Sequence, residues 1–148
     1  MSTNAELIDG YYVWNKGESL WLSNWFRTKE FSCKCSNSDC IKNKISKELI
    51  DRLNTIREET ASPIRVHSAY RCEKYQTHLR ESGVNTVVAQ KSQHELGNAA
   101  DISSSRLTSS ELYNVCKRYF DSLGKANNFT HVDLRPAKPG GVKREWLY

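Results

Sequence analysis

Two histidines and one aspartate in this chain have the residue types and spacing of a catalytic metal site. His94 and Asp101 lie within the stretch SQHELGNAAD at residues 92–101, and His131 follows in the stretch THVD. Two imidazoles and a carboxylate form a tripod for zinc that leaves a fourth position open for water, as catalytic zinc sites do. A zinc ion there would lower the pKa of that water toward neutrality and generate a hydroxide that attacks a carbonyl carbon.

A tight turn and a strand must position these residues. Gly97 and two small alanines lie between His94 and Asp101, so the chain can turn sharply and bring the carboxylate back beside the imidazole. The alternating residues around His131 predict a strand, and side chains two apart on a strand share one face. Asp133 therefore points toward whatever His131 binds.

The remaining elements predict an α+β domain with a small antiparallel sheet flanked by helices. Helices are predicted from Ser46 to the stop at Ser62-Pro63, over residues 72–80, and from Thr108 to a stop at Gly124. Strands are predicted over residues 64–68, 98–102 and 129–134. In the first strand Ile64, Val66 and Ser68 are expected on one face, and residues 84–92 are predicted to form a loop with a short extended piece.

We expect one domain over residues 1–148. Residues 1–30 form an aromatic-rich N-terminal wrap, residues 31–135 form the core that carries the motifs, and residues 136–148 form a C-terminal tail. Three of the four tryptophans lie in the N-terminal segment. These rings are expected to fill the core, although an exposed platform for sugars is the alternative.

Composition excludes several classes of protein. With 38% hydrophobic residues the chain can bury a core without disulfides, and it contains no apolar run of about 18 residues and no N-terminal signal pattern. We therefore expect no membrane partner and synthesis in a cytoplasm. The net charge of +5 favours an anionic partner, but no basic helix or aromatic-basic repeat indicates nucleic acid.

Three motifs in this chain resemble those of the M15 zinc peptidases. This family includes D-alanyl-D-alanine carboxypeptidases and dipeptidases, and the cell-wall endopeptidases of phage lysins. The resemblance covers about residues 22–135, with the motifs in the family's order. The motifs are Asn24-x5-Glu30-Phe31-x-Cys33, Ser68-x-Tyr70-Arg71, and Ser92-x-His94-x2-Gly97-x-Ala99-x-Asp101 followed by His131-x-Asp133.

The resemblance implies a zinc peptidase that hydrolyses stem or cross-link peptides of bacterial peptidoglycan, with a fold like that of the D-alanyl-D-alanine peptidases and the hedgehog domain. Zinc would lie on His94, Asp101 and His131. The enzyme is either an endopeptidase of the endolysin type or a D-alanyl-D-alanine carboxypeptidase. We expect a monomer. It is either made in the host cytoplasm and released by a partner, or carried on a phage particle. The alternative is a non-catalytic module that keeps the zinc and binds cell wall or protein.

The resemblance also suggests roles for residues around the tripod. Arg71 would bind the developing oxyanion or a substrate carboxylate, with a purely structural ion pair as the alternative. Ser68 and Gln93 are candidate substrate-binding donors. Many members place an acid three residues before the last histidine, where this chain has Asn128. Asp133 is therefore the predicted general base or proton shuttle, or else it orients a ligand histidine.

Four cysteines form a second candidate cluster, made of Cys33, Cys35, Cys40 and Cys72. Four thiolates could hold a structural zinc, and the family resemblance suggests that the first and last of them lie close together. A disulfide between Cys33 and Cys72 formed after release from the cell is the alternative, as are free thiols. Cys116, on the apolar stripe of a predicted helix, is expected in the core.

Overall fold

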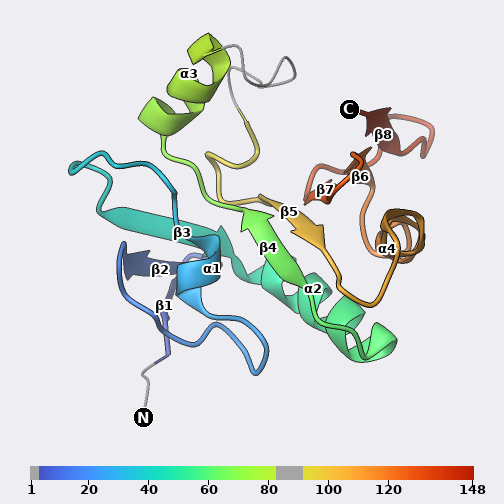
Figure 1. Ribbon diagram of the computed structural model, residues 1–148, viewed down its shortest axis with the longest axis horizontal. Coiled ribbons are helices and arrows are strands. Elements are labelled where there is room, and N and C mark those ends of the chain that lie inside the picture. The colour runs from blue at the N-terminus through green and yellow to red at the C-terminus, as the bar shows by residue number, and fades with distance from the viewer. Residues whose placement is uncertain (1–3, 83–91) are drawn as a thin grey trace.

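Two β-sheets and four helices make up the part of the chain that the computed structural model describes, residues 4–82 and 92–148 (Figure 1). The first sheet is antiparallel and contains β1 (Glu6–Ile8), β2 (Tyr11–Asn15) and β3 (Lys42–Ser46). The second contains, in spatial order, β4 (Arg65–Ser68), β5 (Ala99–Ser103), β7 (Thr130–Asp133), β6 (Ser122–Lys125) and β8 (Arg144–Leu147). The helices are α1 (Thr28–Phe31), α2 (Lys47–Thr60), α3 (Glu73–Ser82) and α4 (Ser109–Cys116).

This architecture confirms the predicted α+β class. The expected single antiparallel sheet is in fact two sheets, and the larger one is mixed because β6 and β8 run parallel. β8 arises from the segment predicted as a C-terminal tail. The predicted loop over residues 84–92 lies outside the described residues except for its last position. No helix in the described part of the chain is long and apolar enough to cross a membrane.

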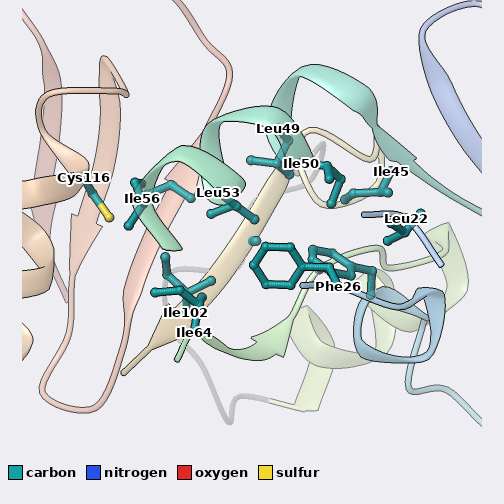
Figure 2. Close-up of a cluster of buried hydrophobic side chains, with 14 of the residues drawn as sticks. Leu22, Phe26, Ile45, Leu49, Ile50, Leu53, Ile56, Ile64, Ile102 and Cys116 are labelled. Atoms are coloured by element: carbon teal, nitrogen blue, oxygen red, sulfur yellow. The ribbon is translucent and has the colours of Figure 1, made fainter. Parts of the chain in front are cut away.

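Helix α2 carries the main core. Its apolar residues recur at helical spacing and bury one face, and Ala61 ends it in a left-handed conformation just before Pro63. The fully buried face of α2 contacts side chains from both sheets and from the N-terminal segment, as Figure 2 shows. This core contains Leu49, Ile50, Leu53 and Ile56 of α2 together with Phe26, Ile45, Ile64 and Ile102.

Only some of the N-terminal aromatic rings lie in the core, where the sequence predicts them. Trp14, Phe26 and Phe31 are buried, as expected for rings that complete the core. Trp21 and Trp25 keep 36% and 43% of their surface exposed, and an arginine side chain stacks over each ring. The wrap is therefore partly core and partly surface.

The helix predicted from Thr108 to Gly124 is too long. Thr108 and Glu111 form the expected capping box, but α4 ends at Cys116, and residues 122–125 form β6. The predicted helix would bury Leu123, and the strand buries it too, opposite Val132 of β7. Pairing with two neighbouring strands therefore decides the structure of a stretch whose apolar spacing fits a helix as well.

Gly124 provides a test of how β8 is held. A Cβ at this position would overlap the rings of Trp146 and Tyr148, so Gly124→Ala must displace β8. We expect urea unfolding to show a loss of about 1–3 kcal/mol in the free energy of unfolding, typical of overpacking. Ser122→Ala on the same strand is the control, because its buried hydroxyl has no partner among the described residues and its removal should cost little. Equal stability of the two variants would contradict the close packing of β8.

Candidate metal centre

Two paired strands and one tight turn bring the predicted tripod together. β5 and β7 pair antiparallel in a register that places Asp101 directly opposite His131. His94 comes from the turn before β5, in which Gly97 has a φ of 73°, a conformation that favours glycine. A Cβ at Gly97 would lie 3.0 Å from the carbonyl oxygen of Lys44, so this turn packs closely against β3. The two sheets together therefore fix the position of His94.

The three side chains are buried and converge on one point. His131 Nδ1 lies 2.9 Å and His94 Nε2 lies 3.5 Å from the same atom, Oδ1 of Asp101. One ligand atom from each residue lies within 4.8 Å of the other two, and each residue exposes only 3–6% of its surface. This is the donor set and spacing of a His2Asp metal site.

A hydrogen bond on the side of the His94 ring that faces away from Asp101 decides which of its nitrogens carries the proton. His94 Nδ1 lies 2.6 Å from the carbonyl oxygen of Ala69, which only accepts hydrogen bonds, so Nδ1 carries the proton. Burial lowers the pKa of His94, and in the neutral ring the lone pair of Nε2 faces the Asp101 carboxylate, so two buried acceptors repel each other. A cation between them would remove this repulsion, so the residues present fit a metal ion.

Charges around Asp101 favour its ionised form. Burial raises the pKa of Asp101, but attraction to the His94 and His131 rings in their protonated forms outweighs burial and holds the pKa well below its usual range. Burial lowers the pKa of His131, but Asp101 and Asp133 on either side of the ring raise it above its ordinary value. A metal ion would compete with a proton at His131 Nδ1.

Asp133 lies behind His131, on the opposite side of the ring from Asp101. Its Oδ2 accepts a hydrogen bond from His131 Nε2 at 2.8 Å. Its Oδ1 accepts from the backbone and side chain of Arg135 at 3.0 and 3.1 Å, and the residue is fully buried. This geometry favours the orienting role of Asp133 over the role of general base.

Arg71 joins the tripod from the loop after β4. Its guanidinium donates to Ser68 Oγ at 3.0 Å, to Gln76 Oε1 at 3.3 Å and to Asp101 Oδ2 at 3.3 Å. Arg71 therefore forms an ion pair with the carboxylate of the tripod. Three of its five N–H donors are used in this way, so two lack partners among the described residues.

Residues 24–133 match the family described as Peptidase M15. The chain belongs to the M15 peptidase family. The match begins at Asn24 and ends at Asp133, so it spans all three motifs that carry the resemblance. No curated protein and no solved structure matches the chain.

The other candidate residues of this M15 peptidase differ in their position relative to the tripod. Ser68 lies opposite Asp101, after a bulge in β4 that interrupts the predicted alternation with Val66, and it supports Arg71. Gln93 is half-buried in the turn that holds His94. Asn128 is exposed and lines a separate cavity of about 230 Å³.

Sequence reasoning missed the aromatic residues at the C-terminal side of the tripod. The ring of Trp146 on β8 lies 5.2 Å from that of His131, and Tyr148 packs against Trp146. Burial raises the pKa of Tyr148, and the Asp101 carboxylate acts in the same direction. Only the pairing of β8 with β6 brings these rings here, and no local pattern in the sequence predicts that pairing.

The four cysteines of the second predicted cluster also come together. Their sulfur atoms all lie within 4.8 Å of one another, and all five cysteines of the chain are free thiols in the described structure. Burial raises the pKa of Cys35, but hydrogen bonds from the Asn37 backbone and the Lys16 ammonium outweigh it and lower the pKa to about 6. Burial raises the pKa of Cys40 to about 12.

These shifts predict selective reactivity in the metal-free protein. The thiolate is the reactive form, so alkylation of Cys35 by iodoacetamide should increase as the pH rises through about 6 and then level off. Lys16→Met removes a hydrogen bond that lowers the pKa and should move this midpoint to higher pH. Lys34→Met, which alters a lysine bonded to the His67 carbonyl instead, is the control. Peptide mapping measures the site, and a wild-type midpoint near 9 would contradict the prediction.

Proposed function

We propose that this M15 peptidase is zinc-dependent and hydrolyses the peptides of bacterial peptidoglycan. The observation that carries the proposal is the convergence of His94 Nε2, His131 Nδ1 and Asp101 Oδ1. The other nitrogen of each ring, Nδ1 of His94 and Nε2 of His131, is hydrogen-bonded to an oxygen, so His94 Nε2 and His131 Nδ1 are the nitrogens that would bind the metal. Zinc at this site would supply Lewis-acid chemistry, polarising a carbonyl and lowering the pKa of water.

The chain's own residues orient this chemistry. The Ala69 carbonyl holds the proton of His94 on Nδ1, and the Asp133 carboxylate holds that of His131 on Nε2. Arg135 keeps Asp133 ionised by donating to both carboxylate oxygens. The resulting pair of fixed imidazoles requires no reorganisation when a ligand enters, which is how preorganised sites lower a barrier.

Arg71 is the residue that we propose to contact substrate. It is anchored by Ser68 and Gln76, and its side chain is 13% exposed at the edge of the tripod. Its remaining N–H donors match the oxygen of a scissile carbonyl or the carboxylate of a stem peptide. An endopeptidase would use the first contact, and a D-alanyl-D-alanine carboxypeptidase would use both.

A non-catalytic module that binds cell wall is the second candidate. The observation that favours it is the environment of Asp133, which is fully buried with both carboxylate oxygens hydrogen-bonded. Such an acid cannot readily take a proton from water. The two candidates differ in turnover, since both keep a metal in the tripod.

Digestion of purified peptidoglycan tests the proposal. The metal-loaded protein should release new amino termini, and mass spectrometry of the fragments should identify the cleaved bond. A chelator or His94→Ala should abolish release, because each removes the ion or one of its ligands. Asn128→Ala, which alters an exposed residue in a separate cavity, is the matched control. Metal-loaded protein that binds wall without releasing amino termini would favour the binding module.

Asp133→Asn separates the two roles of this acid. If Asp133 orients His131, the amide can still accept a hydrogen bond but carries no charge, so zinc affinity should fall about 10–100-fold. Turnover should then recover at saturating zinc. A general base would leave zinc affinity unchanged and abolish turnover. Zinc titration and peptide hydrolysis on the same samples distinguish these results, and full zinc affinity without turnover would reject the orienting role.

A further inference from the structure

We propose that Cys33, Cys35, Cys40 and Cys72 form a second metal site, which binds a structural zinc ion as a tetrathiolate. This proposal does not rest on the peptidase activity, because none of the four cysteines belongs to the His2Asp tripod. Three of the cysteines lie in the stretch between α1 and β3, and Cys72 lies just before α3. The site would therefore join two segments that are distant in the sequence.

The spacing of the sulfur atoms fits a tetrahedral ion. Zinc lies about 2.3 Å from each thiolate in such sites, and tetrahedral geometry then separates neighbouring sulfurs by about 3.8 Å. Cys72 Sγ and Cys35 Sγ are 3.7 Å apart, and all four sulfurs lie within 4.8 Å of one another. A disulfide requires about 2.05 Å between its sulfurs and would leave two thiols of the cluster unexplained.

Nitrogen donors surround the sulfurs, as expected for thiolates. Cys33 Sγ accepts from the backbone N–H of Cys72 at 3.4 Å, and Cys35 Sγ accepts from the Lys16 ammonium at 3.2 Å. Cys40 Sγ lies 3.6 Å from the side-chain amide of Asn43. Four thiolates and Zn²⁺ carry a net charge of −2, so a lysine and amide donors are the groups that would stabilise the cluster.

A buried asparagine holds the stretch that carries three of the ligands. Asn43 is fully buried, and its Oδ1 accepts from the backbone N–H of Cys33 at 2.6 Å. The same side chain reaches Cys40 through its amide nitrogen. Residues 32–41 contain neither helix nor strand, yet Cys33 and Cys40 are buried within them. An ion is the kind of group that orders such a stretch.

The site has a consequence for the tripod, because Cys72 follows Arg71 directly. The backbone N–H of Arg71 donates to the His94 carbonyl at 3.2 Å, and that of Tyr70 donates to the Phe31 carbonyl at 3.1 Å. An ion on Cys72 would fix the end of this segment. The second metal is therefore a positioning element for Arg71.

Metal counting and cobalt substitution test the proposal. Elemental mass spectrometry should find two zinc ions per chain in the wild type, one in Cys40→Ser and one in His94→Ala. Cobalt-substituted wild type should show the intense near-ultraviolet absorption of thiolate-to-metal charge transfer. His94→Ala should keep this absorption, and Cys40→Ser should lose most of it. Cys116→Ala, which removes a buried thiol outside the cluster, should retain both ions.

Hydrogen exchange adds a readout of the positioning role. The amides of Tyr70 and Arg71 should lose protection in Cys40→Ser but keep it in His94→Ala. If Cys40→Ser fails to fold, the cobalt spectrum of the wild type still decides the question. One ion per chain, with no charge-transfer absorption and four freely titratable cluster thiols, would overturn the second site and leave the proposed peptidase intact. Charge-transfer absorption from the cysteine cluster, with no ion retained by the tripod, would support the second site and overturn the proposed zinc peptidase.

Discussion

The rest of this structure depends on how the buried carboxylate of Asp101 is accommodated between two imidazoles. Asp101 is almost completely removed from water, so its charge must be balanced locally. Balance comes from His131 on the neighbouring strand and from Arg71 beyond β4. A one-residue slip between β5 and β7 would place Asp101 and His131 on opposite faces of the sheet. The register of two short strands therefore determines whether the site exists.

The segment from Ser68 to Cys72 connects the two clusters of ligand-type residues. At one end Ser68 supports Arg71, and in the middle the Ala69 carbonyl fixes the ring of His94. At the other end Cys72 joins the four thiols. Five consecutive residues thus serve the tripod and the cysteine cluster at once. The bulge in β4 between Val66 and Ser68 bends the strand where this segment begins.

The sequence predicts what depends on local spacing and misses what depends on distant pairing. The tripod could be predicted because the turn around Gly97 and the alternation around His131 are local patterns, and because these residues form a motif that resembles that of the M15 peptidases. The role of Asp133 could not be settled, because the nitrogen of His131 that it meets depends on the pairing of β7 with β5. The overlong helix before Gly124 and the unrecognised Trp146 have one cause, since β6 and β8 exist only through contacts with each other and with β7.

The ionic groups around the tripod alternate in sign along a line, from Arg71 through Asp101 and His131 to Asp133 and Arg135. With His131 protonated and His94 neutral, the imidazolium, the two carboxylates and the two guanidinium groups sum to +1. Each buried carboxylate in the metal-free centre therefore has a cationic neighbour that balances its charge. The Zn²⁺ that we propose would replace the proton on His131 Nδ1 and raise this sum to +2 in a region of low dielectric. Loading the metal would thus also strengthen the attraction of the site for anionic peptides.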